Sequence, residues 1–528
     1  MAHQLSSLHR FNDTSSFSAD SAQHVKCGGS NRLDLKPRDS LTMEEREEAL
    51  DDLLKHGFFT QIRLTLTEGV LLVSFALLLG ASNIVIGILA AIPSLAQLLQ
   101  VPSIFLVEKY HERKKINLIT TCLNRLALLL MALIPFIAES AAGLLLLVLA
   151  VFLQATFVAI GSPGWNSWLR DLVPQDRLGS YFSKRLSLST AVGVPVSLLA
   201  GVFVDLWALQ NSSAPLIGYS MLFLVAILSG VIGVYYVYKI PEPKMSTPDS
   251  KRTFRVMVTQ PFHDENFGNL MRFSFVWTLS TALAAPFFSV YLLSQLGLNV
   301  PSAIIFTVLT QVASIIFFRL WGRLSDRYSN KSVLQVTVPM YMVGVLLWTF
   351  TTLPSYHLFT IPLLLIIHAL TGISSAGVVL TSGNIGLKLA PRGEATSYLA
   401  ARGIVIAVAG AVAPFIGGLL ADFFSSRQLS FTVIWSAPEG ILQFFTFHLG
   451  GLDFVFVISV IVGIYALHRL ALVKETGEVN ERIVLDAILE ETRRGVKTLS
   501  TVDGLRQTFQ IPIRQRREER RKKGAKFE

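Results

Sequence analysis

The sequence predicts an all-α membrane protein in which twelve transmembrane helices form two parallel six-helix repeats. Three observations lead to this fold: the composition, the recurrence of long apolar segments, and a repeat of the first half of the chain in the second. Of the 528 residues, 52% are hydrophobic and only 16% are charged, whereas a soluble domain carries about 25% charged residues. Apolar segments of about 20 residues recur along the chain, and a helix needs this length to cross the hydrocarbon of a bilayer.

The order of polar and apolar segments divides the chain into five parts. They are a polar tail at 1–56, six spans at 57–238, a polar linker at 239–267, six further spans at 268–470 and a basic tail at 471–528. In the first tail, residues 43–56 are expected to form a short amphipathic helix on the membrane surface. The expected spans are 57–80, 84–107, 116–138, 141–165, 185–206, 216–238, 268–295, 301–321, 333–353, 357–381, 402–424 and 449–470.

The distribution of Lys and Arg among the loops predicts the orientation. These residues concentrate in the loops after spans two, four and eight and in the linker. The alternate short loops contain neither residue; they are 81–83, 139–140, 207–215, 296–300 and 354–356. By the positive-inside rule we expect both termini to be cytoplasmic. We also expect an integral membrane protein of a plasma or inner membrane. The net charge of +10 then belongs to loops and a tail, which argues against nucleic-acid binding.

The two halves of the chain repeat each other at a nearly constant offset. A shift of 217 residues carries the loop after span four onto the loop after span ten, and it carries Asp205 onto Asp422. The matched pairs are Leu172 and Leu389, Pro174 and Pro391, Ser180 and Ser397, Tyr181 and Tyr398, and Arg185 and Arg402. Parallel six-span repeats related by an axis along the membrane normal are an arrangement found in transporters.

A charged turn between spans eight and nine carries a family resemblance. It runs from Gly322 through Asp326 and Arg327 to Lys331 and resembles the signature loop of the major facilitator superfamily. The glycine-proline pattern that begins at Gly410 in span eleven also resembles this family. Further, the segment 162–168 is similar to a group of bacterial permeases whose substrates are unassigned.

The resemblance covers residues 57–470 and implies a secondary transporter. Such a protein would move a small organic solute by alternating access, with a cavity between its two halves. The expected partners are therefore the solute, protons and the lipid bilayer, and a monomer is expected. An alternative from another class is a transporter-like receptor or scaffold that acts through its two long tails.

Polar residues deep in a span are candidates for the solute or proton path, because such residues are expensive in the membrane. Glu68 lies near the middle of span one, and Gln61, Thr65 and Glu68 follow the i, i+4, i+7 spacing of one helix face. In the family that the chain resembles, span one lines the central cavity. Glu68 would then bind solute or exchange a proton; the alternative is a structural ion pair with a basic side chain of the same half.

Other polar residues in the spans admit two interpretations each. Arg125 in span three is expected to be a structural buried charge with a carboxylate or carbonyl partner, and Arg63 is expected to snorkel toward the surface. His368 in span ten serves either coupling or packing. Three glutamines could form hydrogen bonds in the cavity or between helices; they are Gln97, Gln154 and Gln311.

The charged loops are expected to form a gate rather than a substrate site. When the cytoplasmic side closes, we expect Asp326 to lie near Arg185 and Glu108 to lie near Arg402. Each carboxylate would also face the positive N-terminal end of a helix. The predicted gate residues are Gly322, Asp326, Arg327, Glu108, Lys109, Arg185 and Arg402.

The sequence offers no pattern for an enzyme, a cofactor or a metal site. The two cysteines, Cys27 and Cys122, have no disulfide or metal-ligand spacing. No GxxxxGK[ST] sequence is present, which argues against ATP-driven transport.

Overall fold

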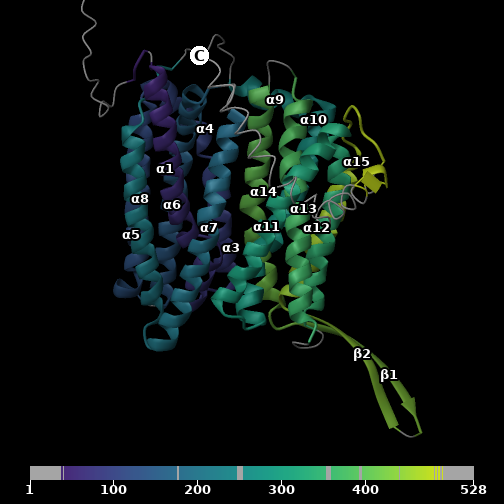
Figure 1. Ribbon diagram of the computed structural model, residues 1–528. Helices are drawn as coiled ribbons and strands as arrows, with labels where there is room; N and C mark the ends of the chain where they lie inside the picture. Colours follow the sequence, from purple (N-terminus) through teal and green to yellow (C-terminus); the bar gives the residue numbers. More distant parts are fainter. Residues whose placement is uncertain are drawn as a thin grey trace, which may run out of the picture.

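A computed structural model of the chain describes residues 37–39, 41–138, 140–174, 178–245, 254–352, 358–391, 395–438, 440–480, 482–484, 486–487 and 490. Twelve segments in this part are long and apolar enough to cross a membrane, which confirms the predicted number and order of the spans. They form two six-span groups that stand side by side (Figure 1).

The first half comprises α1 (Met43–Thr67), α2 (Gly69–Leu78), α3 (Asn83–Gln97), α4 (Gln100–Tyr110), α5 (Arg113–Ile137), α6 (Ser140–Leu172), α7 (Leu178–Gln210) and α8 (Pro215–Lys239). Helices α1 and α2 together form span one, and α3 and α4 form span two.

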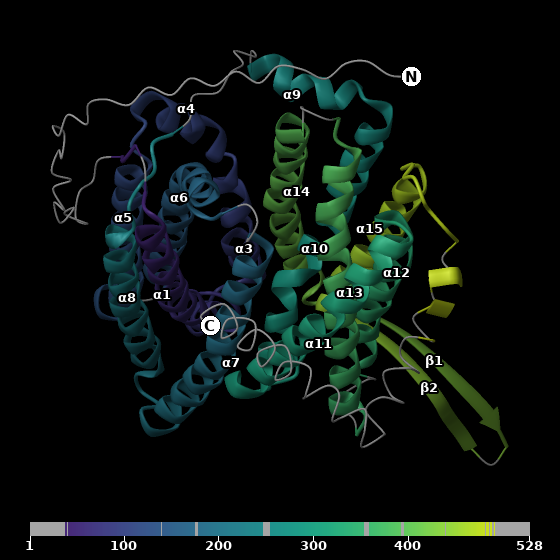
Figure 2. The same ribbon diagram turned by 45° about the horizontal axis from the view of Figure 1, so that its top comes forward.

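The second half follows the short linker helix α9 (Phe254–His263), which lies across one end of the bundle (Figure 2). Its helices are α10 (Glu265–Val290), α11 (Val300–Arg327), α12 (Asn330–Leu347), α13 (Thr360–Leu389), α14 (Ala395–Phe424) and α15 (Leu452–Ala471). A π-helical turn, Tyr291–Gln295, extends α10, and a 3₁₀ turn, Trp348–Phe350, extends α12.

The segment between α14 and α15 is a two-stranded antiparallel ribbon. Strand β1 (Gln428–Ala437) pairs with β2 (Gly440–Gly450), and the ribbon projects away from the helices (Figure 1). Alternating aromatic and β-branched residues such as Phe431 and Val433 favour the extended conformation. We call this end of the bundle the hairpin end, and the end that carries the linker 239–267 the linker end.

The predicted surface helix at 43–56 is not a separate element. Helix α1 begins at Met43 and continues into span one without interruption. Leu50, Leu53 and Leu54 are buried and pack in a cluster that includes Trp168 of α6. Burial of this apolar face within the first half, rather than on a lipid surface, explains the continuous helix.

The two halves meet at the hairpin end, where α3 packs against α14 and α7 against α11. Glycines permit the close approach: a Cβ on Gly418 would come within 2.6 Å of the Asn83 carbonyl oxygen, and one on Gly201 within 2.7 Å of Ile304. Gly410 permits a close approach in the same way, because a Cβ at this position would lie 2.6 Å from Ser94 Oγ. The glycine pattern of span eleven is therefore a packing surface between the halves.

Two carboxylates join the halves at the same end, and the repeat relates them. The Asp422 carboxylate accepts hydrogen bonds from Asn83 N (3.1 Å), Asn83 Nδ2 (2.8 Å) and Ile84 N (3.1 Å) at the start of α3. Asp205 accepts one bond of 3.3 Å from Asn299 Nδ2 at the start of α11. Each aspartate thus lies at the N-terminal end of a helix of the opposite half, where a negative charge is favourable.

Candidate functional site

Span one is broken at Glu68. Helix α1 ends at Thr67, Glu68 is extended (φ −130°, ψ 177°), and α2 starts at Gly69, whose φ is +64°. A left-handed φ is readily adopted by glycine and is strained for other residues, so Gly69 permits the break. The interruption leaves backbone groups at both new helix ends without intrahelical partners. In transporters, such discontinuous helices form substrate and ion sites near the middle of the membrane.

A cavity of about 370 Å³ lies at this break, between the two halves of the molecule. Helices α1 and α2 form one wall, α7 the second and α11 the third. The lining residues are Gln61, Leu64, Thr65, Glu68, Gly69, Val70, Leu71, Gly193, Ser197, Ile304, Thr307 and Gln311. The structure therefore brings four predicted residues together: Gln61, Thr65, Glu68 and Gln311.

The chemistry of this cavity is a single carboxylate among neutral polar groups. Glu68 is exposed to the cavity and forms no ion pair with any residue in the described part of the chain. Gln61 Nε2 donates a hydrogen bond of 3.2 Å to Thr65 Oγ1, which orients both side chains on the same face of α1. Ser197 and Thr307 add hydroxyl groups that the sequence reasoning missed. Small solutes with hydrogen-bonding groups suit such a lining.

Three other predicted residues lie elsewhere. Gln97 is exposed near the linker side of α3, where its Oε1 accepts a hydrogen bond of 2.9 Å from Gln100. Gln154 lies between α6 and α5, with its amide against Met131. His368 is buried; it stacks on Phe306 and its Nδ1 lies 2.9 Å from Thr310 Oγ1.

Both intramembrane arginines of the first half are buried. Arg63 does not snorkel, because it is buried with 6% of its surface exposed. Arg125 is 8% exposed and donates to Asn124 Oδ1, and it has no carboxylate partner among the described residues. The two side chains line one recess of about 190 Å³ between α1, α5 and α6.

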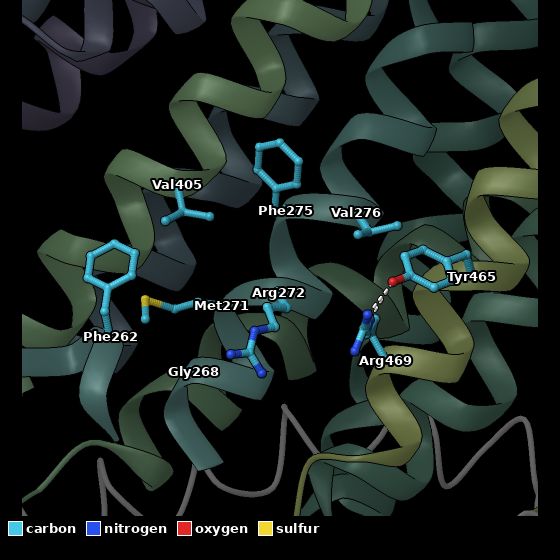
Figure 3. A pocket seen from close by; sticks show the side chains of 9 residues that line it. All are labelled: Phe262, Gly268, Met271, Arg272, Phe275, Val276, Val405, Tyr465 and Arg469. Atoms are coloured by element: carbon cyan, nitrogen blue, oxygen red, sulfur yellow. Dashed lines mark hydrogen bonds between the residues drawn. The ribbon is translucent and has the colours of Figure 1, made fainter. Parts of the chain in front are cut away.

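A third hollow, of about 270 Å³, lies at the linker end of the second half (Figure 3). Apolar side chains such as Met271 and Phe275 form its floor, and two arginines stand at its edge. Arg469 donates to Tyr465 Oη, and Arg272 donates a hydrogen bond of 3.0 Å to Asn269 Oδ1. Both guanidinium groups thus have partners, and none of the predicted cavity residues lies here.

The expected gate pairs are not formed in this conformation. Within the described residues, neither Asp326 nor Glu108 makes an ion pair, and both are exposed. Arg402 instead donates to Ser274 Oγ at 2.8 Å and to Ser382 Oγ at 3.1 Å. The remaining gate residues lie near neighbours of their own half. A Cβ on Gly57 would lie 3.4 Å from Arg185, and one on Gly322 would lie 3.7 Å from Leu380. The Lys109 and Arg327 cations lie over the rings of Tyr110 and Tyr328.

Two buried glutamates at the linker end were not foreseen. Glu242 accepts hydrogen bonds from the backbone N–H groups of Arg113 and Lys114 and from the Arg113 guanidinium. Glu475 has the corresponding position at the start of α12, where its carboxylate accepts a hydrogen bond of 2.7 Å from Lys331 N. In each half, a glutamate after the last span thus caps the first turn of the third span. A shift of 218 residues carries Arg113 onto Lys331 but does not carry Glu242 onto Glu475, so the offset gave no signal for the glutamates.

A family model described as Major Facilitator Superfamily matches residues 57–414 and 274–475. The chain belongs to this superfamily. A curated relative, an uncharacterized MFS-type transporter of Methanocaldococcus jannaschii, is 26% identical over 155 residues, which are 29% of this chain and 38% of that protein. The chain therefore matches well under two thirds of that relative's length.

Solved structures show the same fold. A variant of the nucleoside transporter NupG superimposes with a TM-score of 0.62 at 13% identity, over 81% of this chain and 100% of that chain. A bacterial homologue of the iron transporter ferroportin, in an inward-facing state, gives a TM-score of 0.60 at 15% identity, over 82% and 99% of the two chains. At these identities the likeness concerns the fold alone, and the protein is a membrane transporter by its family.

Proposed function

We propose that this superfamily member is a secondary active transporter that moves a small organic solute by alternating access. The break in span one carries the proposal. It places a carboxylate and freed backbone groups at a cavity between the two halves. A site at this position contacts both halves, so rocking of one half against the other can expose it to either side.

The contacts between the halves support a conformation that is open toward the linker end. At the hairpin end, Asp422 and Asp205 each accept hydrogen bonds from the start of a helix in the opposite half. At the linker end, Asp326 and Glu108 are exposed and do not bridge the halves within the described residues. With both termini in the cytoplasm, as the loop charges favour, this is the inward-facing state.

Glu68 is the proposed coupling residue. Since it lacks a fixed cationic partner within the described residues, its charge is free to respond to a bound solute or proton. A carboxylate that changes its protonation between the two states of the transporter would couple solute movement to a proton gradient.

Solute flux in proteoliposomes, with and without a pH gradient, tests this function. We expect uptake above the equilibrium level only with the gradient, and we expect Glu68→Gln to abolish that excess. Glu112→Gln is the matched control, because Glu112 lies at the surface beside Lys115 and far along the chain from the cavity. Full coupling in Glu68→Gln would show that Glu68 is not the coupling residue. If flux through the wild type only equilibrates the solute, transport is not coupled to protons.

The receptor alternative is tested by shortening the tail. Val484 is buried against the second half, so a deletion should begin beyond residue 490. A transporter keeps its flux without residues 491–528, whereas a receptor that signals through this tail loses its output.

A further inference from the structure

The recess in the first half contains two buried cations and, among the residues that the structure describes, no counter-ion. It is bounded by α1, α5 and α6 and includes Arg63 of α1 and Arg125 of α5. The Nε atoms of both arginines are buried without a hydrogen-bond partner. The Arg63 guanidinium makes no side-chain hydrogen bond within the described residues, and that of Arg125 has only Asn124.

The groups that face the recess do not supply the missing negative charge. From α1 come His56 and Thr60, and His56 Nδ1 lies 3.1 Å from the Gly233 carbonyl oxygen of α8. From α5 and α6 come neutral polar and apolar side chains; they are Asn117, Thr120, Thr121, Asn124, Phe157, Val158, Ser162 and Trp165. A third cation, Arg185 of α7, lies within electrostatic range of His56 and adds to the positive charge.

The nearest carboxylate on α1 serves a different cavity. Glu68 lies in electrostatic range of Arg63, but it lines the cavity between the halves and forms no ion pair with Arg63 in the described structure. Span one thus presents two polar faces. The residues Gln61, Thr65 and Glu68 face the cavity, while His56, Thr60 and Arg63, with the same i, i+4, i+7 spacing, face the recess.

Unpaired guanidinium groups at this depth are unfavourable without a ligand. A buried charge in a membrane protein normally pairs with an opposite charge or with backbone carbonyls. Arginine holds a planar fork of N–H donors that matches the two oxygens of a carboxylate or phosphate. Two such groups in one recess, with amide and hydroxyl groups beside them, are the donor set that an oxyanion requires.

The recess is also kept open by small residues. A Cβ on Gly161 would come within 2.6 Å of Thr120 Oγ1, so a larger residue there would close the space between α6 and α5. On the opposite side, Gly230 of α8 leaves room for the Arg125 side chain. The aromatic groups of Phe157 and Trp165 provide an apolar wall beside the donors.

We infer that this recess binds the carboxylate or phosphate group of an organic anion through Arg63 and Arg125. The proposed function places the transported solute in the cavity between the halves, so the anion in the recess is a second ligand, held within the first half. A phospholipid headgroup would offer the same oxyanion chemistry, and the experiment below separates the two sources.

The test is binding of soluble oxyanions to the full chain in nanodiscs of phosphatidylcholine, a lipid without net charge. Succinate and inorganic phosphate, compared with chloride at equal ionic strength, should raise the Tm of the wild type. In Arg63→Gln and Arg125→Gln the apparent Kd should rise at least about tenfold, because each variant loses a charge-assisted hydrogen bond. Arg272→Gln is the matched control, since Arg272 stands at the unrelated hollow of Figure 3, and it should bind as the wild type does.

The variants Arg63→Lys and Arg125→Lys separate a loss of binding from a loss of folding, because they keep the charge and remove only the planar fork. They should bind more weakly than the wild type while their unliganded Tm stays close to it. Unchanged binding in all four variants, or no effect on the Tm from either soluble probe or from the anionic lipid of the second arm, would overturn the inference.

A second arm replaces part of the phosphatidylcholine by phosphatidylglycerol. If only this lipid raises the Tm, and Arg63 and Arg125 are required, the bound oxyanion is a lipid headgroup, and binding of a soluble anion is overturned. Anion binding without any flux would contradict the transport function but leave the oxyanion site in place, so the two failures are distinguishable.

Discussion

Replacement of Asp422 by asparagine should release the hairpin end of the bundle. The Asp422 carboxylate accepts three hydrogen bonds across the halves, two from Asn83 and one from Ile84. Because all three donors lie in the first turn of α3, the carboxylate also meets the positive end of that helix. Asp422→Asn keeps the size of the side chain but removes its charge and one of its acceptor oxygens.

The size of the effect follows from these contacts. A hydrogen bond to a charged group contributes about 1.5–3 kcal/mol, and a negative charge at a helix N-terminus about 0.3–1 kcal/mol. The asparagine carbonyl can still accept, so at least one bond and the charge interaction are lost. Because Asp422 is only half-buried, the lower values apply, and the loss is about 2 kcal/mol. This corresponds to roughly a 30-fold change in a two-state population ratio.

Accessibility of a cysteine in the cavity measures this ratio. The two native cysteines, Cys27 and Cys122, are replaced by serine, and Ser197→Cys introduces a thiol in the cavity lining. Labelling by a membrane-impermeant maleimide from the hairpin side should become roughly 30-fold faster in Asp422→Asn.

Asp205→Asn is the matched control, because the repeat-related Asp205 accepts a single bond of 3.3 Å. It should shift the labelling in the same direction but less. Unchanged labelling in Asp422→Asn, or a larger effect of Asp205→Asn, would refute the reasoning.

Three further predictions concern stability. Glu242→Ala removes the acceptor of the Arg113 and Lys114 backbone N–H groups and of the Arg113 guanidinium, which keeps its ion pair with Asp171 at 2.6 Å. It should destabilise the fold by about 1–3 kcal/mol, seen as a fall in Tm, whereas Glu112→Ala should leave Tm nearly unchanged. Equal effects would contradict the capping role. Gly69→Ala forces a side chain into a left-handed conformation and should cost about 1–2 kcal/mol, so an unchanged Tm would argue against the break. The hydrogen bond from Lys331 lowers the pKa of Glu478; its contribution is therefore present above the ordinary carboxyl pKa of about 4.3 and is lost as pH falls through the lowered value. Glu478→Gln should flatten this part of the Tm–pH curve, and identical curves would exclude the contribution.

The sequence was sufficient for the spans and for one wall of the cavity. Long apolar segments specify membrane helices almost by themselves, because every backbone group in a membrane must be satisfied within the helix. The stripe of Gln61, Thr65 and Glu68 follows directly from helical spacing, and the structure places all three at one cavity. The repeat between the halves likewise predicted that Asp205 and Asp422 occupy related positions, and both lie at the hairpin end.

Features that depend on contacts between distant segments were not predictable. The break at Glu68 lies within an apolar run, where a single glycine gives little warning of a change in backbone direction. The capping role of Glu242 needs the end of span six to lie at the start of span three, which no local pattern encodes. The burial of Arg63 requires knowledge of which face of α1 meets α5 and α6.

The central claim is that the cavity at the broken span conducts a small solute through the membrane. Proteoliposomes incubated in a cellular metabolite extract, with their contents identified by mass spectrometry, test it most directly. We predict that at least one small organic solute enters vesicles containing the wild-type protein and does not enter protein-free vesicles. Entry should fall in Thr65→Trp, which fills the cavity beside Glu68. Identical contents with and without the protein, or entry that is unchanged by Thr65→Trp, would contradict the account.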